Sequence, residues 1–256
     1  MAEAAGLALA VFGAFNDAIQ CFEYVQLARN FDQDYQTAVL KLDVARLRLS
    51  RWGAAVGLDQ VDRSTQTLPG VAGSPAELEK AKELLEQIVS LFDHATKQSG
   101  ALNKDVYDTA PDLDQATSSL HQKLRQLSLK RFKPKNVVKK VQWALHKEKA
   151  LRRLIEDIKE LVDDLVTVFP AAEPEQKRLC AEEGAELARD DNVPLLMPVL
   201  EEQDADLSAA VKEQSAQRPG STINNVSFAG SNNYGLQQGA FSGHQTNHFG
   251  GYQAPR

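Results

Sequence analysis

The sequence predicts an all-α protein, a multi-helix bundle with a disordered C-terminal tail that can form cross-β amyloid. Apolar residues recur at helical spacing through most of residues 1–217, and almost no stretch there alternates with the period of a strand. The last 38 residues, by contrast, contain no Asp, Glu or Lys and a single Arg. We therefore divide the chain of 256 residues into a helical domain, residues 1–217, and a tail, residues 218–256.

The N-terminal segment is apolar without interruption over residues 4–15, AAGLALAVFGAF, before Asn16 and Asp17 break the run. It is shorter than the roughly twenty residues that a membrane-crossing helix needs, so it is predicted to be a core helix of the bundle. Gly6 and Gly13 are poor helix formers and should weaken its hold on the fold. The functional alternative is that this helix leaves the bundle and enters lipid when many copies act together. The residues expected to insert are Gly6, Leu7, Leu9, Val11, Phe12, Gly13, Phe15, Ile19 and Phe22.

The next helices follow from apolar spacing and from residues that start helices. Residues 35–56 form an amphipathic pattern in which Trp52 is expected to pack in the core rather than to bind a ligand. The run SPAE at residues 74–77 predicts the start of a helix that continues to about residue 98. Asp112 or Asp114 is expected to cap the helix after it.

The longest pattern of helical spacing covers residues 137–169 and predicts one continuous amphipathic helix. A further helix is expected over residues 176–188. Pro194 and Pro198 are then expected to interrupt the chain before a last, acidic helix over residues 200–217.

Charge is unevenly distributed along the helical domain. Residues 123–153 hold twelve Lys and Arg against one acid, and residues 156–206 hold sixteen acids against four Lys and Arg. The basic stretch could meet an anionic lipid leaflet, where each basic residue contributes about 1 kcal/mol. Alternatively, the two stretches are faces of neighbouring helices that neutralise each other. The net charge of −6 and the few aromatics in the basic stretch argue against nucleic-acid binding.

The sequence lacks the motifs of catalytic and cofactor sites. We find no Gly-rich phosphate loop, no metal-ligand spacing and no Ser nucleophile elbow, so we expect no enzyme, no catalytic residues, no cofactor and no metal. Cys21 and Cys180 form no disulfide framework, which suits a reducing compartment. The N-terminus lacks the basic region of a secretory signal, and we expect a cytoplasmic protein at rest.

The tail has the composition of a segment that can stack between chains. It contains seven Gly, five Asn, four Gln and five aromatics. In stacked strands, Asn and Gln would pair their amides along the fibril axis, so we interpret this stretch as self-templating; the alternative is a flexible linker. The amyloid motif, within residues about 222–249, comprises Phe228, Gly230, Asn233, Gly235, Leu236, Gln237, Gly239, Phe241 and Gly243.

Two blocks of the helical domain resemble the HeLo domain of fungal HET-S-type cell-death proteins. The first runs from CFEYVQL at residues 21–27 to LSRWG at residues 49–53, and the second runs from KKVQWAL at residues 139–145 to Phe169. The residues that carry this resemblance, or the core around it, are Phe22, Tyr24, Tyr35, Leu42, Leu49, Trp52, Trp143, Leu145, Leu154 and Phe169. The tail motif, Asn233-x-Gly235-x-Gln237-x-Gly239, is similar to the short pseudo-palindromic, RHIM-like amyloid motif of other fungal cell-death proteins.

The resemblance implies a bundle of eight or nine helices, with or without a tiny hairpin, whose N-terminal apolar segment is the membrane-inserting element. In that family the domain stays latent until a C-terminal segment adopts amyloid structure, which expels the N-terminal helix and lets oligomers permeabilise the plasma membrane. The resemblance further implies that an NLR-type receptor with a NACHT-like domain and a matching motif seeds the amyloid.

These expectations give a leading hypothesis and two alternatives. The first is a latent pore-forming or membrane-disrupting protein of heterokaryon incompatibility or innate-immune-type programmed cell death. Its partners would be other copies of itself, the NLR-type receptor and anionic plasma-membrane lipids, with no nucleic acid, and activation would move it to the plasma membrane. The alternatives are a non-lytic helical signalling adaptor that oligomerises through its amyloid tail, and a cytosolic helical binding module whose tail is incidental.

Overall fold

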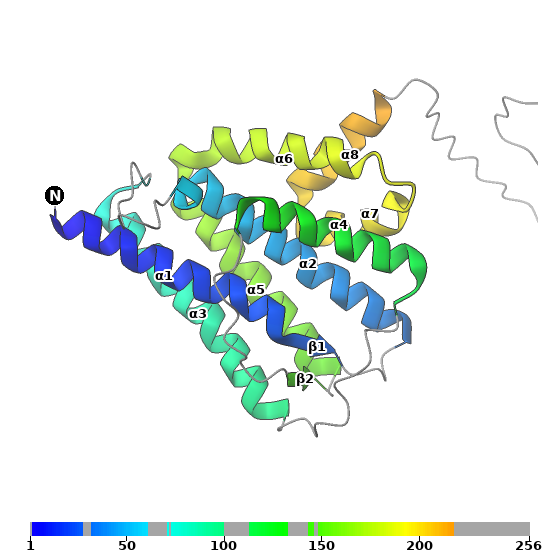
Figure 1. Ribbon diagram of the computed structural model, residues 1–256, viewed down its shortest axis with the longest axis horizontal. Coiled ribbons are helices and arrows are strands. Elements are labelled where there is room, and N and C mark those ends of the chain that lie inside the picture. Colours follow the sequence, from blue (N-terminus) through cyan, green and yellow to red (C-terminus); the bar gives the residue numbers. More distant parts are fainter. Residues whose placement is uncertain are drawn as a thin grey trace, which may run out of the picture. The chain divides into compact units, whose positions relative to one another are not determined.

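The computed structural model describes residues 2–27, 32–60, 71, 73–99, 113–132, 143–145 and 148–217, and within them the predicted all-α fold is confirmed (Figure 1). All residues of the proposed amyloid motif lie outside the described residues. Residues Met1–Ser215 form one compact unit. The helices of the described residues are α1 (Ala2–Tyr24), α2 (Asp32–Ala55), α3 (Pro75–Ser99), α4 (Gln115–Arg131), α5 (Glu148–Val168), α6 (Glu173–Leu187), α7 (Val193–Gln203) and α8 (Ala205–Ala216).

Two short strands accompany the helices, β1 (Val25–Leu27) and β2 (Trp143–Leu145). They pair in parallel, with Val25 opposite Trp143 and Leu27 opposite Leu145, so the two strands do not form a hairpin. The continuous helix predicted over residues 137–169 is therefore wrong at residues 143–145, which form β2, and the described helix α5 covers Glu148–Val168. Of the residues of β2, Trp143 has a high strand propensity, and pairing with β1, a segment far away in the sequence, overrides the helical spacing.

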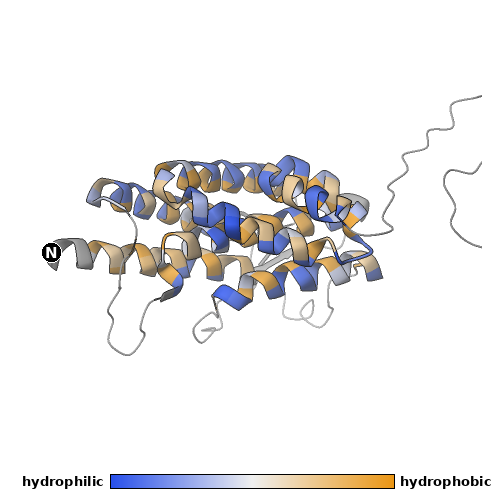
Figure 2. Ribbon diagram, turned by 90° about the horizontal axis from the view of Figure 1, so that it is seen from above, coloured by the Kyte–Doolittle hydropathy of each residue, from blue (hydrophilic) through white to orange (hydrophobic). Residues whose placement is uncertain are grey.

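The helix α2 runs through the middle of the bundle and separates two hydrophobic clusters (Figure 1). One cluster, which we call the N-terminal core, joins buried residues of α1, α3 and α5 to one side of α2. The other, the C-terminal core, joins α4, α6, α7 and α8 to Leu40, Val44 and Leu47 on a second side of α2. Most helices carry hydrophilic residues on one face and hydrophobic residues on the other, whereas residues 6–15 of α1 include no charged residue (Figure 2).

Local sequence features set the starts of α3 and α4. At α3, the Ser74 hydroxyl accepts a hydrogen bond from the Glu77 N–H at 3.3 Å, and the Glu77 carboxylate accepts one from the Ser74 N–H at 2.6 Å. This reciprocal pair is a capping box, at the helix start that the SPAE run predicts. At α4 the cap is Asp114, whose carboxylate accepts from the Thr117 N–H at 2.7 Å.

The C-terminal helices differ from the prediction in where they break. Pro194 and Pro198 do not interrupt the chain. Pro194 lies in the first turn of α7, where its missing N–H has no helical partner, and Pro198 lies inside α7 without ending it. The break falls instead at Asp204, so the single helix expected over residues 200–217 is two helices, α7 and α8. The helices α6 and α8 come close at Gly184, where an added Cβ would lie 2.8 Å from the Cβ of Ala210.

Candidate functional site: the N-terminal helix and its packing site

One face of α1 is buried in the N-terminal core. Val11, Phe15 and Ile19 are at most 2% exposed, and three alanines on the same face are buried with them. The helix packs mainly along α3 and, to a lesser extent, on α2. The spacing of four residues between the three large side chains puts them on one stripe, so a single helix face makes the contact.

Phe15 is the central contact of this face. Its ring lies 4.5 Å from the Phe132 ring, edge to face, and 6.1 Å from the Trp52 ring, measured between centroids. Both distances are within the range in which aromatic pairs stabilise a core beyond their buried area. The floor of this packing site is Gly53, where an added Cβ would come within 2.6 Å of the Phe15 ring. The Phe15 ring therefore occupies the space that any larger residue at position 53 would need.

A second aromatic contact holds the C-terminal half of α1. The Phe22 ring lies 5.0 Å from the Phe92 ring of α3, again edge to face. Trp52, which is fully buried, also contacts the Phe169 ring at 5.6 Å. Phe15, Trp52 and Phe169 thus form a continuous series of ring contacts from α1 through α2 to the residue that follows α5, and the Phe22–Phe92 pair is a separate contact.

The opposite face of α1 is open. Gly6, Gly13 and Asp17 are exposed, and an added Cβ at either glycine would meet no atom within 4 Å. Leu7, Leu9 and Phe12 lie between the two faces and are half-buried. For residues 6–22, the part of α1 whose side chains are described, no ion pair joins the helix to the rest of the bundle. Apolar contact is thus the main attachment of α1.

The described helices include none whose length and hydropathy together suffice for a membrane span. The predicted inserting residues, Gly6 through Phe22, all lie on α1, but they divide between its buried and exposed faces. Insertion itself remains a prediction.

The residues that carry the family resemblance gather mostly in the N-terminal core. Tyr35, Leu42, Leu49, Trp52, Leu154 and Phe169 are buried there, and Phe22 packs against it. Trp143 and Leu145 lie in β2 and Tyr24 ends α1, but the side chains of these three lie outside the described set.

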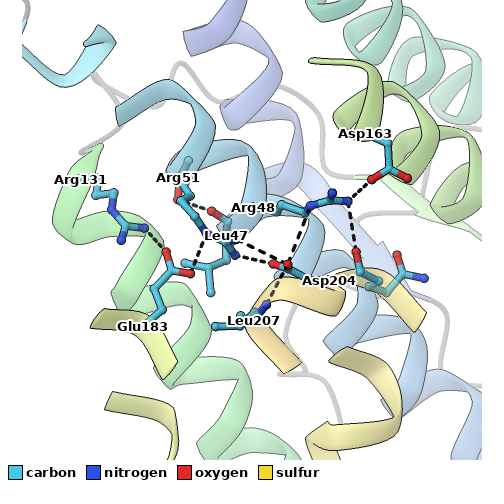
Figure 3. Close-up of polar contacts among 10 residues, drawn as sticks. Leu47, Arg48, Arg51, Arg131, Asp163, Glu183, Asp204 and Leu207 are labelled. Carbon is cyan, nitrogen blue, oxygen red and sulfur yellow. Dashed lines mark hydrogen bonds and ion pairs between the residues drawn. The ribbon is translucent and has the colours of Figure 1, made fainter. Parts of the chain in front are cut away.

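A buried ion cluster lies on the other side of α2, and sequence reasoning missed it. It joins Arg48 and Arg51 of α2 and Arg131 of α4 to Asp163, Glu183 and Asp204 (Figure 3). The Arg51 Nε donates to Glu183 Oε2 at 3.0 Å, and its Nη2 donates to Asp204 Oδ2. All three side chains are at most 4% exposed. We call these six residues the ion cluster.

Electrostatics keep Arg51 charged in this buried place. Burial acts to lower the pKa of its guanidinium, but the charges of Glu183 and Asp204 outweigh burial and raise the pKa. Arg131 approaches Glu183 from the other side, and Lys130 donates to Glu186 at 2.6 Å. The basic stretch and the acidic stretch therefore do neutralise each other in part, between α4 and α6.

A titratable pair also joins α2 to α4. The His121 Nδ1 lies 2.6 Å from Asp43 Oδ2, and this hydrogen bond raises the pKa of His121. Burial acts in the opposite direction on the histidine, as do the charges of Arg125 and Arg46. The pair is the one place in the described bundle where a histidine meets a carboxylate.

The described residues give little indication of a reactive thiol or a metal site. Burial raises the pKa of Cys180 to about 12, so its thiol stays protonated at neutral pH. No group of three or more His, Cys, Asp and Glu in the described part of the chain has the arrangement of a metal site.

Comparison with known proteins identifies the family to which this architecture belongs. A family model described as "HeLo: Prion-inhibition and propagation" matches residues 4–196. The chain belongs to the HeLo family. The match includes both blocks in which the sequence resembles that domain, from CFEYVQL to Phe169. It also includes all of α1 except its first two residues.

Two curated relatives come from the fungus Podospora anserina. Heterokaryon incompatibility protein S is 33% identical over 217 residues, which is 82% of this chain and 72% of that protein. Heterokaryon incompatibility protein s is 37% identical over 169 residues, which is 64% of this chain and 57% of that protein. The chain thus spans little more than half the length of the second relative.

Two solved structures share the fold. The HET-S N-terminal domain and a variant of the HET-s N-terminal domain both match with a TM-score of 0.68 at 31% identity. Each match covers 80% of this chain, and it covers 93% of the HET-S chain and 98% of the HET-s chain.

Proposed function

We propose that this HeLo protein is a latent cell-death execution protein of the heterokaryon incompatibility type, which kills by disrupting the plasma membrane. Both curated relatives carry the name of heterokaryon incompatibility proteins, and neither name is that of an enzyme. The similarity to the first relative extends over 82% of this chain. It therefore supports assigning the same broad role to this protein.

The proposal that α1 inserts into the membrane rests on how α1 is attached to the bundle. Its described side chains reach the bundle through apolar contacts, centred on Phe15, and through no ion pair. An apolar face loses little when it exchanges a protein core for lipid, because both environments exclude water. The two exposed glycines lower the intrinsic helix stability of α1 within the bundle. Oligomers of released α1 helices would then permeabilise the bilayer.

Activation would come from the tail. In this proposal residues about 222–249 convert to stacked sheet, templated by a matching motif on an NLR-type receptor, and the protein moves from the cytoplasm to anionic plasma membrane. Stacking gathers many HeLo domains on one fibril, which raises their local concentration and favours joint insertion. The uncharged, Asn- and Gln-containing composition of the motif supports this step.

The test uses Gly13→Glu with Gly13→Ser as its matched control. Both side chains point into open space, so both variants should fold. A charge at the centre of an inserted helix costs about 3 kcal/mol, whereas a hydroxyl costs far less. With fibrils of a 219–256 peptide as seed, we expect dye release from anionic vesicles by the wild type and by Gly13→Ser, and none by Gly13→Glu.

Equal leakage from both variants would refute insertion of α1. Seeded assembly without any leakage, even by the wild type, would favour the non-lytic adaptor. A 219–256 peptide that forms no cross-β fibrils would remove the switch and leave the cytosolic binding module.

A further inference from the structure

The start of α3 is the one place in the sequence where a serine or threonine is followed directly by proline. Of the ten prolines in the chain, only Pro75 has such a neighbour, Ser74. Proline-directed protein kinases recognise this dipeptide, in which proline supplies no backbone N–H and favours an extended backbone at the residue before it. Two residues make a short motif, so the structure around Ser74 decides whether a kinase can reach the hydroxyl.

The chain around Ser74 is accessible. Gly73, Ser74, Pro75 and Ala76 are four consecutive exposed residues. The backbone just before them is fixed, because Gly73 has a φ of +128° and an added Cβ there would lie 2.6 Å from the Phe169 ring. The chain therefore leaves the core at Gly73 and presents the Ser–Pro dipeptide at the surface.

The hydrogen bonds of the Ser74 side chain and backbone differ in length. The Ser74 hydroxyl accepts from the Glu77 N–H at 3.3 Å, whereas the Ser74 N–H donates to the Glu77 carboxylate at 2.6 Å. The bond to the hydroxyl is longer than most N–H···O bonds, so releasing the hydroxyl to a kinase costs little. The helical ladder begins one residue later, where the Leu78 N–H donates to the Ser74 carbonyl at 3.0 Å.

We propose that Ser74 is a phosphorylation site for a proline-directed protein kinase. In the reaction the Ser74 Oγ attacks the γ-phosphorus of ATP, and the bond from that phosphorus to its bridging oxygen breaks. ADP leaves, and the hydroxyl proton passes to the base of the kinase. The site goes beyond the proposed function, because it adds covalent control at the start of α3 and depends on neither lipid nor fibrils.

The phosphate would change the cap of α3. It carries close to two negative charges at neutral pH, and its oxygens are strong acceptors for the N–H groups of a first helical turn. The Glu77 carboxylate occupies the same helix end, where the hydrogen bond from the Ser74 backbone N–H lowers its pKa. Two anions then compete for the same end of the helix. Phosphorylation therefore turns Glu77 from a favourable residue at this position into an unfavourable one.

The first test asks whether a kinase modifies Ser74 in the folded, full-length protein. The protein is incubated with ATP and a mitogen-activated protein kinase whose activity on a peptide of residues 69–80 has been established, and mass spectrometry locates the phosphate. We expect phosphate on Ser74 of the wild type and loss of it in Pro75→Ala, which keeps the hydroxyl and places a good helix former at the first position of α3. Absence of phosphate from Ser74, or equal incorporation in Pro75→Ala, would overturn the site.

The second test asks whether the phosphate competes with Glu77. Glu77→Gln keeps the geometry of a capping box and removes the charge. The readout is amide hydrogen exchange of Leu78, whose N–H makes the bond to the Ser74 carbonyl. We expect Glu77→Gln to speed this exchange by about twofold in the unmodified protein and to slow it by about twofold in the phosphorylated protein. A change in the same direction in both forms would overturn the competition.

Discussion

The N-terminal core and the C-terminal core hold their outer helices by different means. In the N-terminal core, the described part of α1 is held by shape and apolar contact, with Phe15 set against Trp52, Phe132 and the bare backbone at Gly53. In the C-terminal core, α6 and the α7–α8 junction are held by aliphatic packing and also by the ion cluster. Both cores share α2, which presents aromatic and small residues to one side and arginines to the other.

Under the proposed function, this difference decides which helix would leave the bundle. Apolar contacts can be exchanged for lipid at little cost, whereas buried ions would have to be separated or carried into a medium of low dielectric constant. A helix held like α1 is therefore suited to moving, and helices held by the ion cluster are suited to staying. The arrangement also makes the two sides unequal in their response to single substitutions.

The largest effect is expected from Arg51→Met, which removes the centre of the ion cluster. Glu183 and Asp204 would be left buried with one counter-charge fewer, and breaking a buried pair in this way costs about 3–5 kcal/mol in the free energy of unfolding. Urea denaturation measures the loss. Arg178→Met is the control, because that arginine makes its pairs on the exposed side of α6 and its removal should leave the midpoint nearly unchanged. Similar midpoints for the two variants would contradict the importance of burial.

An intermediate effect is expected at two glycines that differ only in what surrounds them. Gly53→Ala forces a Cβ against the Phe15 ring and should destabilise the protein by about 1–3 kcal/mol. Gly13→Ala meets open space in the middle of α1 and should stabilise it by up to about 1 kcal/mol. Thermal or urea unfolding of the two variants should therefore shift in opposite directions. A shift of the same sign in both would show that the packing site of Phe15 is less tight than its geometry indicates.

The smallest effect is expected in how the stability of the protein depends on pH, and it comes from the His121–Asp43 pair between α4 and α2. The hydrogen bond from Asp43 raises the pKa of His121 above its ordinary value of 6.5 in the folded protein. A raised pKa means that the folded state binds the proton more tightly, so the stabilisation is fully present below pH 6.5 and is lost as the pH rises through the folded pKa. Stability curves of the wild type and His121→Gln, measured across this range, should converge at the alkaline end. If the stability curves of the two proteins stayed parallel across this pH range, ionisation of the His121–Asp43 pair would contribute nothing to stability.

Much of the bundle was predictable because it depends on neighbours in the sequence. The capping box at Ser74 and Glu77 and the core position of Trp52 follow from short patterns, and the structure contains both. Residues 143–145 were predicted to be helical and are a strand, because their pairing partner is β1, more than a hundred residues earlier. Arg46 and Arg51 fall outside the apolar stripe of α2, yet each is only 3% exposed. No local pattern reveals that Glu183 of α6 and Asp204, between α7 and α8, will cover Arg51.

The sequence by itself determined that this chain forms an amphipathic helical bundle, that its first helix is unusually apolar and that its last residues are almost without charge. These properties depend on composition and on spacing within a few turns. Only the tertiary structure decided which face of α1 is buried, where Gly53 receives the Phe15 ring, and that Asp204 both caps the first turn of α8 and pairs with Arg51. The physical reason is that burial and charge pairing depend on which distant segments meet, and in this protein several meet on one central helix, α2.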